Sequence, residues 1–90
     1  MKKYIIERTI PGVEKFTPQE LKEATATSNA ATAKLWPRLQ WVESFITPDK
    51  TFCVYLAEGE GVIQEHSQLS GFPANRVNEV GGIIDPATAG

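Results

Sequence analysis

Hydrophobic and polar residues alternate near the start of the chain and then change to a helical spacing. Lys3 to Thr9 mixes β-forming side chains with charged ones, and Pro11-Gly12 follows as a turn, so the pattern predicts a first strand. Thr17, Pro18 and Glu20 then match the cap, the first position and the third position of a helix. We therefore predict a helix that begins at Thr17.

This first helix is predicted to have one narrow face of small side chains with a leucine at each end. The residues of that face recur at steps of three and four, namely Leu21, Ala24, Ser28, Ala31 and Leu35. Such a face can lie close against a sheet. Pro37 disfavours helical geometry at Trp36, so the helix should end there.

A β-hairpin is predicted next, because residues 40–47 and 51–57 are rich in aromatic and β-branched side chains and the turn-forming Pro48-Asp49-Lys50 separates them. The run from Phe52 to Leu56 is apolar on both faces, which predicts a central strand covered on both sides. A hairpin loop of two or three residues decides which face of the first strand shares a side with Cys53, and the sequence leaves both lengths open.

The rest of the chain predicts a second amphipathic helix and a weak last strand. Residues 58–70 carry a helical stripe that consists of Val62, Ile63, His66 and Leu69. Gly71 is a natural helix stop, and Phe72-Pro73 confirms that the helix does not continue. Residues 77–84 contain strand formers interrupted by two glycines, which predicts a bulge or an edge strand.

The order strand, helix, strand, strand, helix, strand is that of the ferredoxin-like α+β sandwich, with a four-stranded antiparallel sheet and both helices on one face. The other face of the sheet is then uncovered. Either Cys53 and Tyr55 or their neighbours Val54 and Leu56 must lie on it, which exposes an apolar patch. We expect a homodimer formed through these sheet faces, a dimeric α+β barrel.

Length and charge limit the classes of protein. The 90 residues fit one domain, residues 1–90, with a core at about 3–86 and a loose tail at 87–90. A net charge of -2 removes the basic surface that nucleic acid binding needs. The first apolar run breaks at Glu7 and Arg8, too soon for a signal peptide, and no membrane span is predicted. We expect a cytoplasmic protein with no nucleic acid or membrane partner.

The chain has a single cysteine and a single histidine, which exclude an internal disulfide and a closed structural zinc site. His66 lies on the inward stripe of the second helix, where it is either a neutral hydrogen-bonded residue or a ligand or proton carrier in a cleft. Cys53 is either a small hydrophobic residue of the core or a soft metal ligand. Glu7, Arg8 and Arg76 are expected to form salt bridges at strand ends, with no chemical role.

Glu43 is the sole carboxylate in an otherwise neutral run, and simple alternation puts it on the same strand face as Trp41 and Phe45. Inside the protein it would need a partner or a cation, whereas outside it would be solvated. Trp41 and Tyr55 each offer an apolar body with a polar tip, so they can line a pocket or fill the core.

Several blocks of the sequence, in this order, are similar to one family. They are Tyr4–Arg8 with Ile10–Gly12, Gln40–Phe45 with Asp49–Tyr55, Glu65-His66 with Gly71–Asn75, and Ile84–Pro86 with Thr88. Across about residues 3–88 the chain resembles the small bacterial nickel-binding, nickel-responsive proteins long filed as a domain of unknown function. The resemblance implies a ferredoxin-like homodimer, nickel binding as in a characterised member, and no assigned catalytic reaction.

Nickel(II) favours imidazole nitrogen, with carboxylate oxygen and thiolate as companions. We therefore expect a partly hydrated or dimer-shared nickel site whose candidate ligands are His66, Glu43, Glu65 and Cys53. The competing hypothesis is a small-molecule pocket or an enzyme of the isomerase, cofactor-free oxygenase or haem protein type, with His66 as a general base and Trp41 and Tyr55 lining the cleft. A third possibility is a structural or regulatory dimer without a ligand.

Overall fold

The alternating residues near the N-terminus form the first of four strands in the computed structural model, which describes residues 1–90. The elements in chain order are β1 (Lys2–Thr9), the short 3-10 helix η1 (Val13–Lys15), α1 (Pro18–Leu35), β2 (Leu39–Thr47), β3 (Lys50–Ala57), α2 (Glu60–Ser70), β4 (Arg76–Glu79) and the 3-10 helix η2 (Pro86–Ala89). The predicted order of strands and helices is confirmed, and η1 and η2 are additions, since the sequence pattern did not indicate η1 and residues 87–90 were expected to form a loose tail.

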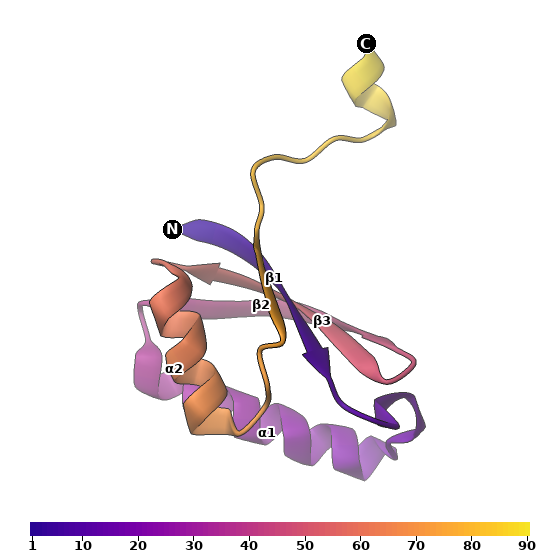
Figure 1. The fold of residues 1–90 in the computed structure, drawn as a ribbon, viewed down its shortest axis with the longest axis vertical. Helices are drawn as coiled ribbons and strands as arrows, with labels where there is room; N and C mark the ends of the chain where they lie inside the picture. Colours follow the sequence, from indigo (N-terminus) through magenta and orange to yellow (C-terminus); the bar gives the residue numbers. More distant parts are fainter.

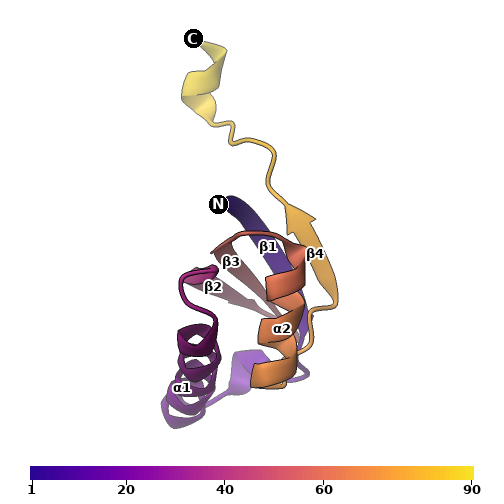
Figure 2. The same cartoon turned by 90° about the vertical axis from the view of Figure 1, so that its left-hand side faces the viewer.

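The four strands form one antiparallel sheet in the order β2-β3-β1-β4. Strand β3 lies between β2 and β1, so the prediction of a central strand is confirmed. Both helices cover the same face of the sheet (Figures 1 and 2). The protein therefore has the predicted ferredoxin-like α+β fold, with one sheet face covered by helices and one open. No helix combines the length and the hydropathy that a bilayer span requires.

Helix α1 begins where the predicted capping box lies. The Thr17 Oγ1 atom accepts a hydrogen bond from the Glu20 N–H at 3.2 Å, and the Glu20 carboxylate accepts one from the Thr17 N–H at 3.0 Å. Two N–H groups that have no partner within the helix are satisfied in this way. The helix ends at Leu35, just before the predicted boundary, and its buried residues Ser28, Ala31 and Leu35 belong to the predicted narrow face.

The hairpin between β2 and β3 has a two-residue turn, because Thr47 pairs with Lys50. Asp49 in this turn has a φ of 59°, in the left-handed region that Asn and Asp tolerate best after glycine. A short loop fixes the register of the pair, so it decides which face each side chain of β2 occupies. Ser44 and Ile46 of β2 therefore share a side with Cys53, whereas Phe45 lies on the opposite face.

A β-bulge between Trp41 and Glu43 then shifts the register, and Val42 is the extra residue. Trp41 pairs with Tyr55 and lies on the helix-covered face, whereas Glu43 pairs with Val54 on the open face. The expectation that Glu43 and Trp41 share a face is wrong for this reason, since simple alternation cannot include an inserted residue. The Trp41 Nε1–H donates to the Ser44 Oγ at 2.9 Å across the bulge.

The core lies between the sheet and the helices. It consists of Tyr4, Ile6, Leu35, Leu39, Cys53, Tyr55, Ala57, Val62 and Ile63. The open face carries the half-buried Phe52, Val54 and Leu56 of β3 together with Phe45 of β2, whose side chain is 55% exposed. The apolar patch predicted for the uncovered face is present, and Val54 and Leu56 rather than Cys53 and Tyr55 supply it.

Strand β4 is the predicted edge strand, but it is shorter than expected. It ends at Glu79 instead of continuing to Ile84, and residues 81–90 are all exposed and extend away from the sheet (Figure 1). Gly81 and Gly82 are therefore part of the departing segment and not a bulge. Ile83 and Ile84 are 73% and 85% exposed, so the tail presents two apolar side chains that its own domain does not cover.

Replacing Thr17 with alanine removes the cap of α1, and we expect the free energy of unfolding to fall by about 1 kcal/mol. Thermal and urea unfolding of Thr17→Ala measure this change. Thr27→Ala is the matched control, because Thr27 is exposed within the same helix and alanine has the higher helix propensity. Equal stability of the two variants would contradict the capping role of Thr17.

Candidate functional site

The site forms around Arg8, which continues the inward alternation of β1. Tyr4, Ile6 and Arg8 lie two residues apart, and their exposed fractions are 4%, 0% and 2%. Strand geometry gives them the same face, so the arginine is carried into the layer between the sheet and the helices. A guanidinium that is almost fully buried is costly unless its donors and its charge are satisfied.

Uncharged groups satisfy most of the donors of Arg8. Its Nη1 donates to two main-chain carbonyls after α2, and its Nη2 donates to one side chain of β3 and one of α2. The acceptors are the Phe72 oxygen at 3.0 Å, the Pro73 oxygen at 3.1 Å, the Tyr55 hydroxyl at 3.2 Å and His66 Nδ1 at 3.3 Å. The guanidinium carbon also lies 5.8 Å from the centroid of the Tyr55 ring, within cation–π range. Arg8 thus ties β1, β3, α2 and the segment after α2 together.

No carboxylate pairs with Arg8. The expectation of a salt bridge at the strand end is therefore wrong for Arg8. It is confirmed for Glu7, whose carboxylate lies 3.7 Å from the Arg76 Nε and 3.6 Å from the Lys50 Nζ. The alternation of β1 is the signal that could have separated the two neighbours, because it places Glu7 on the open face and Arg8 inside.

His66 lies on α2 and is 1% exposed. Its Nδ1 faces the Arg8 Nη2, and its Nε2 lies 3.3 Å from the Ser28 Oγ on α1. Arginine has no acceptor, so Nδ1 must accept and the ring proton must be on Nε2, from which it is donated to Ser28. The ring also meets the Tyr55 ring edge to face, with centroids 5.4 Å apart. His66 is thus held on three sides.

The surroundings of His66 and Tyr55 favour their neutral forms. Burial, together with the positive charge of Arg8, lowers the pKa of His66 to about 4. Burial raises the pKa of Tyr55, although the charge and hydrogen bond of Arg8 oppose this change. At pH 7 the imidazole and the phenol are therefore both uncharged, and Arg8 is the only ion in this part of the core.

The four candidate nickel ligands lie in three separate places. Glu65 is exposed on α2, where both of its oxygens accept from Arg38, and this contact lowers the pKa of Glu65. Glu43 is exposed on the open face of the sheet. Cys53 and His66 are both buried between the sheet and the helices, with the Cys53 Sγ 3.4 Å from the Thr51 Oγ1. No three His, Cys, Asp or Glu side chains of the chain converge on one point.

The tautomer of His66 also does not suit a metal ligand. A histidine that binds a metal through Nε2 normally donates its Nδ1–H to an acceptor. Here Nδ1 faces the Arg8 Nη2, which can only donate. A nickel ion on Nε2 would therefore require Arg8 to leave Nδ1, and it would bring a second positive charge near a buried guanidinium. In this arrangement the four candidate residues do not fit nickel.

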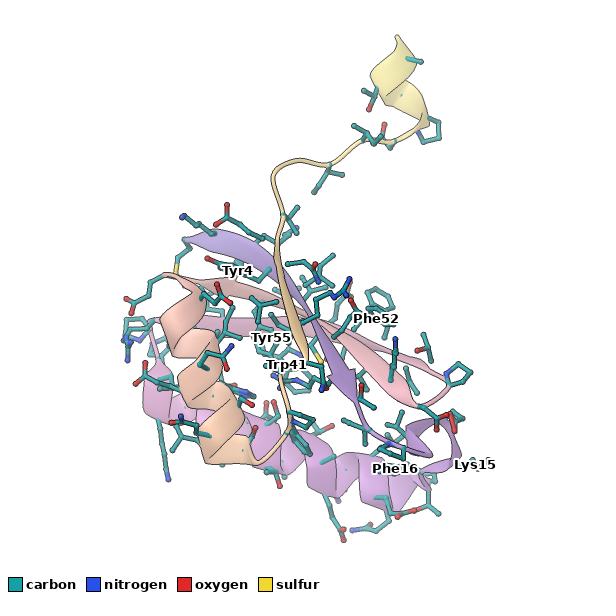
Figure 3. All side chains as sticks on the ribbon, in the orientation of Figure 1. Tyr4, Lys15, Phe16, Trp41, Phe52 and Tyr55 are labelled. Atoms are coloured by element: carbon teal, nitrogen blue, oxygen red, sulfur yellow. The ribbon has the colours of Figure 1, made fainter.

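A cleft of about 280 Å³ opens beside Arg8, between the sheet and the N-terminal half of α1. Ten of its fifteen lining residues are hydrophobic, and these include Ile10, Val13, Phe16, Leu21, Trp41 and Ile46. Trp41 and Tyr55, the two residues considered for a pocket, both line it from the helix-covered face of the sheet (Figure 3). Ser28 and Cys53 line it as well, whereas His66 does not.

These features define a small ferredoxin-like α+β domain with a cleft between its sheet and its first helix. The chain belongs to the family described as nickel responsive protein SCO4226-like, whose model matches residues 4–80. This confirms the family predicted from the sequence.

Among solved structures, the chain is similar to SCO4226 from Streptomyces coelicolor A3(2). The TM-score is 0.74 at 15% sequence identity, over 91% of this chain and 99% of that chain. At this identity the similarity shows the fold alone. No curated protein matches the chain.

We expect the burial of His66 to make the metal-free protein less stable at acid pH. The pKa of His66 is about 4 in the folded protein and 6.5 as its ordinary value, so between these values the unfolded chain binds a proton that the folded protein does not. The contribution of the neutral His66 to the free energy of unfolding is complete above pH 6.5 and is lost as the pH falls to 4. The loss amounts to about 3 kcal/mol.

Urea unfolding at several pH values and one protein concentration measures this loss. Because carboxylates also titrate at acid pH, the comparison is with His66→Gln, which keeps a polar side chain but has no imidazole to protonate. The wild-type curve should fall more steeply than that of the variant between pH 6.5 and 4. Parallel curves would contradict the buried neutral imidazole.

Proposed function

We propose that this protein binds nickel(II), with His66 as its imidazole ligand and carboxylate and water oxygens in the remaining positions. The observation that supports this proposal is membership of the nickel-responsive family over residues 4–80. Imidazole and carboxylate donors suit nickel(II) chemically. The cytoplasmic location predicted from the sequence remains a prediction.

The structure sets a condition on this proposal. Binding at His66 requires Arg8 to release Nδ1, so part of the binding free energy is used to break that contact. Glu43 cannot complete the same site from within one chain, because it lies on the opposite face of the sheet. We therefore expect modest affinity at His66, and Glu43 on the open face, where a second copy can approach, is the other location to test.

Calorimetric titration of nickel into protein purified without a histidine tag tests the proposal. We expect saturable binding by the wild type and at least a tenfold lower affinity for His66→Gln, because the only imidazole is lost. Glu60→Gln, which removes an exposed carboxylate of α2, is the matched control and should bind normally.

The outcomes separate the function from the ligand. An unchanged isotherm for His66→Gln together with weakened binding by Glu43→Gln would move the site to the open face. Absence of binding by the wild type would overturn nickel binding altogether. A thermal shift series across divalent metals adds an independent measurement, since a metal that binds only the folded state raises the unfolding temperature.

We also propose that the protein is a homodimer formed through the open faces of the sheet. Support comes from the side chains of the open face that a single copy leaves uncovered, since Phe45 and Ile5 are 55% and 36% exposed. The C-terminal segment extends away from the sheet (Figure 1) and adds the exposed side chains of Ile83 and Ile84. An exposed apolar surface of this kind is typical of an interface, and in a two-fold symmetric dimer the second copy presents the same surface.

Light scattering after size-exclusion chromatography should give a mass of twice 9.9 kDa for the wild type. Val54→Glu places a carboxylate at the centre of the open face and should give the 9.9 kDa monomer, because a buried unpaired charge is costly. Gln64→Glu, on the exposed side of α2, is the control and should remain a dimer. A wild-type monomer at high micromolar concentration would contradict this interface.

The geometry does not favour the alternative in which His66 is a general base. Its pKa of about 4 makes it a weak base at neutral pH, its Nδ1 lone pair is occupied by Arg8, and its ring does not line the cleft. What remains of that hypothesis is the cleft itself, which can bind a molecule without transforming it.

A further inference from the structure

Arg8 is a buried cation without a counter-ion, and it lines the cleft between the sheet and the first helix. Its hydrogen-bond acceptors are all neutral, and no aspartate or glutamate lines the cleft. Carbonyl and hydroxyl oxygens satisfy the donors but do not cancel the charge. A buried charge without an opposite charge is among the least favourable features of a protein interior. An anion in the cleft would remove this imbalance.

The hydrogen bonds around Arg8 leave donors available to such an anion. A guanidinium carries five N–H donors, of which the four on Nη1 and Nη2 are used, and the Nε–H bonds no other residue. Every fully buried polar side-chain atom of the protein has a hydrogen-bond partner, so the unpartnered Nε atom cannot be fully buried. Because Arg8 lines the cleft, we take the cleft as the space from which an anion reaches this donor.

Two hydroxyl groups that line the cleft are hydrogen-bonded to Arg8 or to His66. Tyr55 accepts from the Arg8 Nη2, and Ser28 accepts from the His66 Nε2–H, because Arg8 fixes that tautomer. Each hydroxyl has therefore used an acceptor position. The Ser28 hydroxyl also interacts with the Tyr55 side chain, so a carboxylate would accept from Ser28 in place of that contact. Ser28 and Tyr55 both line the cleft. One guanidinium and two hydroxyl groups, linked by hydrogen bonds directly or through His66, thus line the same cleft.

The hydrophobic walls of the cleft favour a ligand whose uncharged part is apolar. The walls are mostly hydrophobic and include the aromatic side chains of Phe16 and Trp41, and the cleft volume of about 280 Å³ is small for a ligand pocket. A doubly charged phosphate would need more than one cation, and the apolar walls offer no second one. A singly charged, planar carboxylate matches one guanidinium and two hydroxyl groups.

From these observations we infer that the helix–sheet cleft binds a small apolar monocarboxylate, whose carboxylate pairs with Arg8 and accepts from Ser28 and Tyr55 while its apolar body lies against Phe16 and Trp41. This is a binding site on the helix-covered side of the sheet, separate from the open face. The site uses neither Glu43 nor Glu65, so nickel held by these surface carboxylates leaves it unchanged, whereas nickel at His66 would compete with it for Arg8.

Phenylacetate and its uncharged amide, phenylacetamide, are the matched probes, since they share size and shape and differ in charge. Two-dimensional amide NMR titration of the wild type should show saturable shifts at cleft residues, with phenylacetate binding at least tenfold more tightly than the amide. Tyr55→Phe removes one donor and should weaken phenylacetate binding roughly tenfold, with a smaller effect on the amide.

A second pair of variants tests the location without altering Arg8. Ala24 lines the cleft and Ala26 is exposed on the same helix, so Ala24→Leu should fill the cleft and abolish binding of both probes, whereas Ala26→Leu should change neither. The spectra of the unliganded variants report whether each one is folded. Equal affinity for the two probes, shifts that survive Ala24→Leu, or no saturable shift at millimolar concentrations would each overturn the inference.

Discussion

The hydrogen bonds of one buried guanidinium connect most parts of this domain. Arg8 reaches from β1 to the Tyr55 hydroxyl on β3, to His66 on α2 and to the carbonyls of Phe72 and Pro73 after that helix. Because arginine can only donate, every neighbour must present an acceptor to it. That single requirement orients the imidazole, the phenol and the chain that leads into β4. The orientation of the His66 and Tyr55 side chains and the chemistry of the cleft therefore have the same physical origin.

The same contact determines what His66 can do. A neutral imidazole that accepts at Nδ1 and donates at Nε2 is a good structural link between α1 and α2, and it is poorly prepared to hold a metal or to accept a proton. Membership of a nickel-responsive family thus favours metal binding, whereas the arrangement of this histidine does not favour it. They are reconciled if nickel binding opens the Arg8 contact, or if the ion is held on the open face of the sheet.

The two faces of the sheet divide the chemistry of the protein. The helix-covered face carries Arg8, Tyr55 and Cys53 and encloses a cleft with one cation. The open face carries Glu43 among apolar side chains and suits another protein surface. A two-residue turn and a bulge in β2 decide this division, since they determine which residues of that strand face inward.

Local patterns in the sequence were sufficient for the two α-helices and the order of the four strands, because capping, periodicity and turn residues act over a few neighbouring positions. The start of α1 at Thr17, the central position of β3 and the end of α2 at Gly71 follow from such patterns. The alternation of β1 could also have indicated that the Arg8 side chain points inward. Only the tertiary structure decided the partners of Arg8, the tautomer of His66 and the face of Trp41, because these depend on contacts between residues that are far apart in the chain and on an inserted residue that shifts the register.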